Sequence, residues 1–406
     1  MTERLYIKPG STVTLDHVDG DLEVDSHAIV RGTGTPTTVR VSGTVYCEGE
    51  NTFECTLIAE NLEAKGNVTV RGGLEIRGSV EVEDGTLEVY GKVTADNVDV
   101  DETLYITKDL TADEVEVGGS LRTEGNVKAD QIEVGGSFKA KGEVTADEVE
   151  IGGTFLTEAK VNIQKLEVGG TASVHGGKIR MIDVGGSFES TEPFEFESIN
   201  VGGTVRLANN NKGGDIEVGG SLKIDGDLEF RNIEVGGKIE ITGSGQGHGM
   251  EVGGKVGVDG SLKLSSNLEV GGKAEIGGEV VAQNIEVGGV LRSKRAQAQN
   301  NIEVGGVIDT TEGSTARFVE IGKRGEVHGS VKADEIVIGK DAQAESLYGK
   351  RILLRSGAHA ANVYGEIVTI ESHCQISGEI QYTQELRVGN HVSLAKQPKK
   401  VSVLPQ

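Results

Sequence analysis

Acidic side chains recur along the chain at nearly constant spacing, and they are the residues best suited to chemistry. Carboxylates bind divalent cations and attract basic partners. If each interval is one coil of a stack, neighbouring carboxylates would lie about 5 Å apart and repel by about 1 kcal/mol in water. We call this row the acidic ladder; it consists of Glu116, Glu133, Glu150, Glu167, Asp183, Glu217, Glu234, Glu251, Glu269, Glu286, Glu303 and Glu320, with Asn200 as the one interruption.

The acidic ladder has two interpretations. It could gather cations or dock a basic partner, or it could be a solvated strand face whose repulsion is relieved by Arg122, Lys139, Arg206 and Lys223. The sequence lacks the Asp-rich turns of calcium-binding repeats, which favours the solvated face. A second, shorter row is expected to hydrogen-bond along the stack through its amides; it consists of Asn267, Asn284 and Asn301.

Histidines and cysteines are the other candidates for chemistry. His373 and His391 follow an apolar residue by the same three positions, so we expect them to stack, with Cys374 adjacent. Two histidines without a third ligand are weak evidence for a metal, and we predict neither a metal site nor a cofactor. The chain contains an odd number of cysteines, namely Cys47, Cys55 and Cys374, and their spacing is not that of metal ligands. This pattern favours a reducing compartment over a disulfide framework.

A repeat positions these side chains. Val-Gly-Gly, or Ile-Gly followed by Gly or Lys, recurs at intervals of 17 residues, with one interval of 16 and one of 18. Fixed periods of this kind are typical of solenoids. The β-branched residue of the motif is Val117, Val134, Ile151, Val168, Val184, Val201, Val218, Val235, Val252, Val270, Val287, Val304, Ile321 and Ile338.

Period-2 alternation within each unit predicts three short strands. Val115 and Val117 bracket an acidic residue, Leu121 follows the glycines, and Val127 and Ala129 form a third apolar pair. We therefore predict an all-β, single-stranded β-solenoid, or β-helix, with a triangular cross-section and about 17 residues per coil. We expect the Gly-Gly pair to turn the corner with positive φ. About 23 coils would make a rod on the order of 110 Å long.

Composition excludes several classes of function. The chain has 406 residues, 61 of them glycine, only 4% aromatic residues and a net charge of −24. This charge disfavours nucleic acid and anionic membrane surfaces. We expect no transmembrane segment and no secretion signal, because long apolar stretches are lacking. A uniform series of coils without inserted loops offers no pocket for catalysis, so we do not expect an enzyme.

The repeat also suggests how the chain is divided. We predict irregular coils and a cap in 1–66, regular coils in 67–317, a further set of coils in 318–395, and a short tail in 396–406.

The segment 318–395 resembles the core of the bactofilin family. It contains Val-Glu-Ile-Gly-Lys-Arg-Gly-Glu-Val-His-Gly-Ser-Val-Lys-Ala-Asp at 319–334, then Ile-Val-Ile-Gly-Lys-Asp-Ala at 336–342 and Gly-Glu-Ile at 378–380. The array from about 100 to 317 is similar but more regular. The resemblance implies a right-handed triangular β-helix that polymerises end to end without nucleotide. It also implies a cytoskeletal scaffold in the cytoplasm, with the inner face of the membrane or other envelope and cytoskeletal proteins as possible neighbours.

We therefore expect a structural protein that forms homopolymers through the two ends of its coils. An open core and unpaired strand edges are costly to expose. The alternative is a monomeric spacer or binding module that uses the acidic ladder, for example at the cell surface. The residues expected at the polymerising ends are Leu5, Ile7, Leu386, Val388, Val392 and Leu394.

Overall fold

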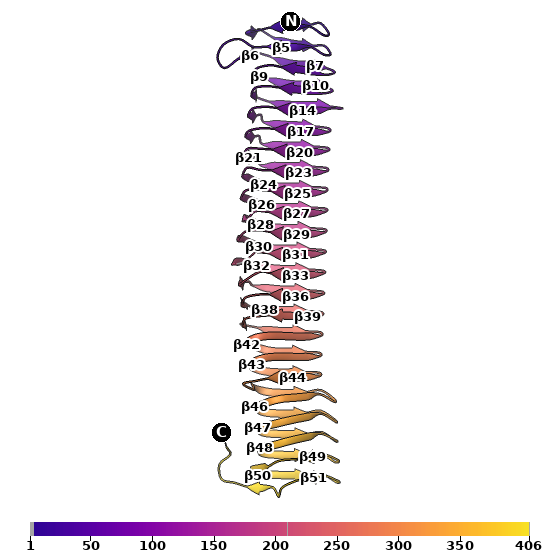
Figure 1. The fold of residues 1–406 in the computed structure, drawn as a ribbon, viewed down its shortest axis with the longest axis vertical. Helices are drawn as coiled ribbons and strands as arrows, with labels where there is room; N and C mark the ends of the chain where they lie inside the picture. The colour runs from indigo at the N-terminus through magenta and orange to yellow at the C-terminus, as the bar shows by residue number, and fades with distance from the viewer. Residues whose placement is uncertain (1–3, 209, 406) are drawn as a thin grey trace. The chain divides into compact units, whose positions relative to one another are not determined.

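The computed structural model describes residues 4–208 and 210–405, and within them it contains strands, turns and loops but no helix. Contacts divide the chain into an N-terminal unit, 1–202, and a C-terminal unit, 203–406. Within each unit, successive coils stack through parallel strands about 17 residues apart (Figure 1). The prediction of an all-β solenoid is confirmed.

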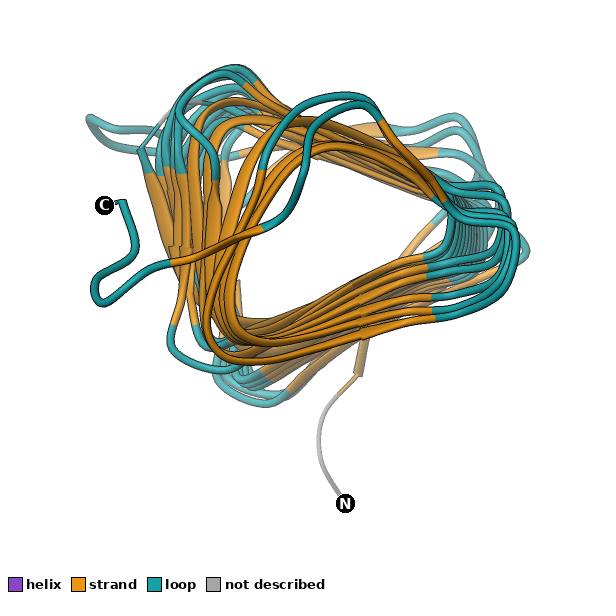
Figure 2. Cartoon of the chain, turned by 90° about the horizontal axis from the view of Figure 1, so that it is seen from below, coloured by secondary structure: helices purple, strands orange, loops and turns teal. Residues whose placement is uncertain are grey.

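Each complete coil carries strands on three sides, and loops turn many of the corners between them, as the coils nearest the viewer in Figure 2 show. We number the sides 1, 2 and 3 in chain order. Alternate residues of each strand point inward. Val115 and Val117 on side 1 are completely buried, as are Leu104 and Ile106 on side 2 of the coil before. Burying each such side chain contributes about 1.5–3 kcal/mol, so the core is a continuous column of aliphatic layers within each unit.

In the N-terminal unit, side 1 consists of β1 (Arg4–Ile7), β4 (Asp21–Val24), β7 (Thr44–Glu48), β10 (Asn61–Lys65), β13 (Ser79–Glu83), β16 (Asn97–Val100), β19 (Glu114–Val117) and β22 (Gln131–Val134). Side 2 consists of β2 (Thr12–Thr14), β5 (Ile29–Arg31), β8 (Asn51–Phe53), β11 (Val68–Val70), β14 (Thr86–Val89), β17 (Thr103–Ile106), β20 (Ser120–Thr123), β23 (Ser137–Ala140), β25 (Thr154–Thr157), β27 (Thr171–Val174) and β29 (Ser187–Ser190).

Side 3 of this unit consists of β3 (His17–Val18), β6 (Thr38–Val41), β9 (Thr56–Ala59), β12 (Leu74–Ile76), β15 (Val93–Thr94), β18 (Leu110–Thr111) and β21 (Val127–Lys128). Later strands run unbroken from side 3 into side 1 of the next coil: β24 (Val144–Ile151), β26 (Val161–Val168), β28 (Gly177–Val184) and β30 (Phe194–Val201). Between β5 and β6 the chain makes an extra loop, closed by an antiparallel bridge between Thr33 and Thr38.

In the C-terminal unit, side 2 includes β31 (Thr204–Leu207), β33 (Ser221–Ile224), β36 (Lys238–Ile241), β39 (Lys255–Val258), β44 (Val307–Thr310), β49 (Gln375–Ile376) and β51 (Ser393–Leu394). Side 3 includes β34 (Leu228–Glu229), β37 (Gly245–Gly247), β40 (Leu262–Leu264) and β52 (Lys399–Lys400), and side 1 includes β35 (Asn232–Val235), β38 (Gly249–Val252) and β41 (Asn267–Val270).

The remaining strands of this unit cover more than one side. They are β32 (Asn211–Val218), β42 (Lys273–Val287), β43 (Val290–Val304), β45 (Ser314–Ile321), β46 (Glu326–Ile338), β47 (Gln343–Leu354), β48 (His359–Ile370) and β50 (Ile380–Val388).

The Gly-Gly corners are built differently from our prediction. We expected positive φ, but φ at these pairs lies outside the left-handed region. The requirement is steric instead, because an added Cβ at Gly135 would lie 2.3 Å from the carbonyl oxygen of Gly118 in the preceding coil. The amide of Gly135 donates to the carbonyl of Val117 at 2.9 Å, so the hydrogen-bond ladder continues through the corner. The Gly-Gly corners therefore require glycine because adjacent coils stack too closely to leave room for a Cβ. Positive φ does occur at Gly226, which lies at another corner, between sides 2 and 3.

Candidate functional site

The acidic ladder lies on side 1, where each member faces outward between two buried residues. Strand register pairs Glu116 with Glu133, Glu133 with Glu150, and Glu150 with Glu167 in the N-terminal unit. The nearby carboxylate of Asp99 is the largest cause of the raised pKa of Glu116, with burial and Glu133 adding to it. Stacking therefore places like charges close enough to disfavour full ionisation.

The acidic ladder extends further toward the N-terminus than the sequence repeat indicated. Glu63 pairs with Glu81, Glu81 with Asp99, and Asp99 with Glu116. Partial burial, followed by neighbouring carboxylates, raises the pKa of Asp99. The Val-Gly-Gly motif is missing from these coils, so only the alternation of acidic and apolar residues could have revealed these members.

In the C-terminal unit the acidic ladder continues in the same register. Glu217 pairs with Glu234, and the series runs without a break to Glu320. Burial raises the pKa of Glu303, and Glu286 and Glu320 raise it further. A shallow hollow of about 300 Å³ lies beside Glu251, Glu269 and Glu286. The arrangement provides a line of negative potential.

The basic residues expected to relieve this repulsion pair elsewhere. Arg122 bonds to Glu124, Lys139 to Glu158, and both Arg206 and Lys223 to Asp225. The prediction was wrong because these cations project from side 2, across the Gly-Gly corner from the acidic ladder. One cation on side 1 does reach it, since Lys165 Nζ lies 2.6 Å from Glu167 and 2.7 Å from Glu148.

Two smaller predictions concern stacked polar side chains. The Nδ2 of Asn284 donates to the Oδ1 of Asn267 at 2.9 Å, and Asn301 follows in register. The rings of His373 and His391 stack with centroids 5.2 Å apart. Both histidines have φ near +60°, in a turn that recurs at Arg324, Asp341 and Gly357 in earlier coils. The stack therefore follows from a shared turn position.

The described residues, 4–208 and 210–405, contain no group of three or more His, Cys, Asp and Glu side chains able to hold a metal ion. The three cysteine thiols are free and buried. Burial raises the pKa of Cys47 to about 12 and that of Cys55 to about 11. These thiols are part of the core and are poor nucleophiles.

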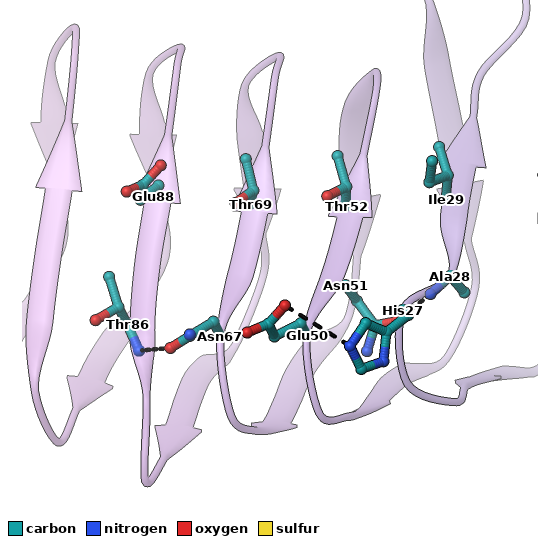
Figure 3. A pocket seen from close by; sticks show the side chains of 10 residues that line it. All are labelled: His27, Ala28, Ile29, Glu50, Asn51, Thr52, Asn67, Thr69, Thr86 and Glu88. Atoms are coloured by element: carbon teal, nitrogen blue, oxygen red, sulfur yellow. Dashed lines mark hydrogen bonds and ion pairs between the residues drawn. The ribbon is translucent and has the colours of Figure 1, made fainter. Parts of the chain in front are cut away.

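An open hollow of about 550 Å³ faces side 2 of the first coils in the N-terminal unit (Figure 3). His27 lies 3.9 Å from Glu50 at its edge. The side-chain oxygen of Asn51 accepts from the amide of Ala28 at 3.1 Å, and that of Asn67 accepts from the amide of Thr86 at 2.9 Å. The side-chain amides of Asn51 and Asn67 therefore stabilise turns of the chain, and this structural role accounts for the polar lining of the hollow.

The first coil leaves an open edge on the N-terminal unit. Within the described residues, β1, β2 and β3 pair only with the coil that follows. Leu5 is 42% exposed and Tyr6 is 49% exposed, whereas Ile7 is only 3% exposed. Of the two predicted contact residues here, Leu5 therefore offers most of the apolar surface. The hydroxyl of Tyr6, on the outward face of β1, donates to Asp25 of the following coil at 2.7 Å.

The last coil leaves a corresponding edge on the C-terminal unit. Inward-facing side chains that are buried one coil earlier are partly exposed to solvent in the last coil. Ile370 is 1% exposed, but Val388, its partner in register, is 46% exposed. Leu386, Val392 and Leu394 are half-buried. Four predicted contact residues therefore gather at this edge.

The described part of the segment expected to be a tail, residues 396–405, partly covers this same edge. β52 pairs in parallel with β50, with Lys399 opposite Gln381 and Lys400 opposite Tyr382. The amide of Val401 donates to the carbonyl of Tyr382 at 2.9 Å, and Lys396 Nζ lies 3.1 Å from Glu379. The rest of β50, including Val388, has no strand beyond it among the described residues.

A search of the described residues found no helix of the length and apolar character needed to span a membrane.

Comparisons with known proteins give one family. Neither the curated proteins nor the solved structures contain a match to this chain. A family model does match, and it covers residues 56–153, in the N-terminal unit, whereas the sequence motifs had pointed most clearly to 318–395. The resemblance itself is confirmed: residues 56–153 of this β-solenoid chain are similar to the bactofilins, a family described as polymer-forming and cytoskeletal.

Proposed function

We propose that the chain is a structural protein that assembles end to end into filaments without nucleotide. The observation that carries the proposal is the pair of open coil edges, one at the start of the N-terminal unit and one at the end of the C-terminal unit. Each combines unpaired strand edges with half-exposed apolar side chains. Such edges are templates for strand addition, and the matched family is described as polymer-forming.

Assembly would join the edges of different molecules. Strand pairing would satisfy the backbone groups of β1 and β50, and packing would cover Leu5 and Val388. Burying a fully exposed side chain of this kind contributes about 1.5–3 kcal/mol. Because Leu5 and Val388 are already about half covered, each supplies about half of that amount, and several such side chains at one edge add together in favour of association. The net charge of −24 opposes contact between molecules, so assembly would be favoured by salt. We propose the cytoplasm as the location and other copies of the chain as the principal partner.

Electron microscopy and sedimentation of the purified chain, without nucleotide and over a series of protein and salt concentrations, test this proposal. Filaments that increase with salt are expected. Single particles under every condition would overturn it. Leu5→Lys and Val388→Lys should each raise the concentration needed for assembly by about tenfold or more, because a charge would be buried at the contact.

Met181→Lys is the matched control for these variants. Met181 is 42% exposed, as Leu5 is, but it lies on β28 in the middle of a paired side. This variant should assemble as the wild type does. If all three lysine variants raised the concentration needed for assembly equally, the effect would come from the added surface charge and not from contacts at the coil edges.

The acidic ladder favours a second candidate, a monomeric module that binds a cation or a basic partner. Its support is the in-register stacking that raises the pKa of Asp99 and Glu116. Thermal melts with and without calcium test this function. A rise in melting temperature that disappears in Glu116→Gln and Glu133→Gln would support it, and identical melts would oppose it.

A further inference from the structure

The corner between sides 1 and 2 takes two forms along the chain. In the regular coils it is the Gly-Gly corner, where the inward-facing residues on either side, Val117 and Leu121, are four positions apart. In the first coil the corresponding residues, Ile7 and Val13, are six positions apart, and Gly10 between them has a φ of 65°. The first coil therefore turns this corner through a longer loop that contains a left-handed residue.

The last coil turns the same corner through the same longer loop. Val388 and Leu394 are six positions apart and stand in register with the buried residues Ile370 and Ile376 of the coil before. Between them, His391 has a φ of 57°. The two open edges of the chain thus share one form of corner, although the regular coils use the other.

One hydrogen bond joins corners of the longer form in successive coils. The amide of the left-handed residue donates to the carbonyl of the residue that precedes the next left-handed residue. Gly10 donates in this way to Ser26 at 2.9 Å, and His373 donates to Asn390 at 3.0 Å. The amide of His391 has no backbone acceptor within the described residues. Another corner of the longer form, stacked on the last coil, would supply the missing carbonyl.

The inward-facing side chains of the two edges also match. Ile7 and Val388 each lie three positions before the left-handed residue of their corner. Aligned corners therefore place β1 in register on residues 385–388, with Leu5 against Leu386 and Ile7 against Val388. Leu5 is 42% exposed and Val388 is 46% exposed, so each edge offers the apolar side chain that the other leaves uncovered.

The outward-facing charges of the same strands are complementary. The alignment places Arg4 beside Glu385, which bonds to Arg387 in its own coil at 2.7 Å. On its other side, Arg4 already lies 3.0 Å from Glu23 of the following coil. The contact therefore puts one guanidinium between two carboxylates, an arrangement that charge-assisted hydrogen bonds favour.

The alignment also places Arg387 beside the ring of Tyr6. The same pair of residue types occurs in register within the N-terminal unit, where the guanidinium of Arg122 lies 5.6 Å from the ring centroid of Tyr105 in the adjacent coil. A cation at this distance over an aromatic face is attracted by it. The outward residues of the two edges thus reproduce a contact that successive coils already make.

We propose that copies of the chain join head to tail, with β1 and β2 of one copy paired in parallel on residues 385–388 and β51 of another. The amide of His391 donates to the carbonyl of Pro9 of the other copy. This inference rests on the end-to-end assembly proposed above and adds its direction and its register. Joining two like edges requires a two-fold axis, which reverses the strands and makes their pairing antiparallel, so the corners could not continue.

Mixing two blocked variants tests the direction. Leu5→Lys blocks the first edge and Val388→Lys blocks the last, so each variant keeps one intact edge. Head-to-tail contact predicts that each variant alone is monomeric, whereas an equal mixture forms heterodimers and nothing longer. Size-exclusion chromatography with light scattering would measure this at about threefold the concentration at which the wild type assembles, where half or more of the intact edges should be joined.

The outcomes separate this inference from the proposed function. Dimers of either variant alone would show that like edges join, and would overturn the head-to-tail contact. A mixture that stays monomeric while the wild type forms filaments would also overturn it. A wild type that never assembles contradicts end-to-end assembly itself. Circular dichroism melts show whether each variant is folded, and the next test leaves both blocked positions unchanged.

A cross-link tests the register. Thr12 on β2 and Ser393 on β51 are exposed, and they align when the corners align. Registered neighbours on adjacent strands lie about 5 Å apart, which a disulfide can span. A chain with Thr12→Cys and Ser393→Cys should form covalent polymers on oxidation, and its three native thiols are buried. The matched control, Thr14→Cys with Ser393→Cys, moves one thiol by about 7 Å and should cross-link far less. Equal cross-linking of both chains would contradict the register.

Discussion

Gly152 stacks on Gly135 so closely that a Cβ at Gly152 would lie 2.1 Å from the carbonyl oxygen of Gly135. The two residues occupy the same corner of successive coils, and the amide of Gly152 donates to the carbonyl of Val134 at 2.9 Å. Real Cβ atoms do not approach an oxygen at this distance, so one methyl group must push two coils apart.

Gly152→Ala is therefore expected to destabilise the N-terminal unit by about 1–3 kcal/mol, the usual effect of overpacking. Thermal and urea denaturation followed by circular dichroism would measure the loss. Gly257→Ala is the matched control, because its Cβ has ordinary contacts and its melting temperature should equal or slightly exceed that of the wild type. Equal losses in both variants would mean that glycine acts through backbone flexibility and not through stacking.

The acidic ladder predicts that stability depends on pH. The pKa values of Asp99 and Glu116 are raised in the folded state, so folding binds protons as these groups titrate. Their contribution is most favourable below the ordinary carboxyl pKa and becomes less favourable as pH rises from there through the raised values. Other carboxylates with lowered pKa, such as Glu275, act in the opposite direction.

Glu116→Gln isolates this effect. At neutral pH and low salt it should stabilise the chain by about 0.5 kcal/mol, because it removes repulsion between exposed charges. The gain should vanish below the carboxyl pKa and shrink in high salt. Glu124→Gln is the control of opposite sign, since Arg122 and Lys141 both bond to Glu124. Melting curves across pH measure both, and a gain for Glu116→Gln that persisted in acid would contradict this account.

The segment that carries β52 is expected to slow assembly at the C-terminal edge. It occupies the edge of β50 at Gln381 and Tyr382, where an added strand would otherwise pair. Deleting residues 397–406 should therefore shorten the lag before filaments form, measured by light scattering. Val403→Ser is the control, because Val403 is 77% exposed and lies outside β52. A longer lag in the deleted chain would show that the segment takes part in the contact.

Predictions from the sequence were most accurate in the coils where the 17-residue repeat is strict. The alternation around Val115 and Val117 predicted which side chains are buried, and the 17-residue interval predicted that Glu116 and Glu133 share a position. The same reasoning missed Glu63, Glu81 and Asp99, because the interval there varies and the glycine motif is missing. It also assigned Arg122 and Lys139 to the wrong partners, since spacing along the chain does not show whether a side chain on one side of a coil reaches a carboxylate across the corner.

The sequence by itself determined the all-β class, the coil length, the inward and outward positions and the rows of like residues. These depend on period-2 alternation and on a fixed repeat, both of which are local properties of a strand. Only the tertiary structure decided why the corner glycines are needed, which cations meet which carboxylates, how far the last strand covers β50, and that Gly257, unlike the corner glycines, has room for a Cβ. Each of these depends on the distance between adjacent coils, and so on atoms that are close in space but about 17 residues apart in the chain.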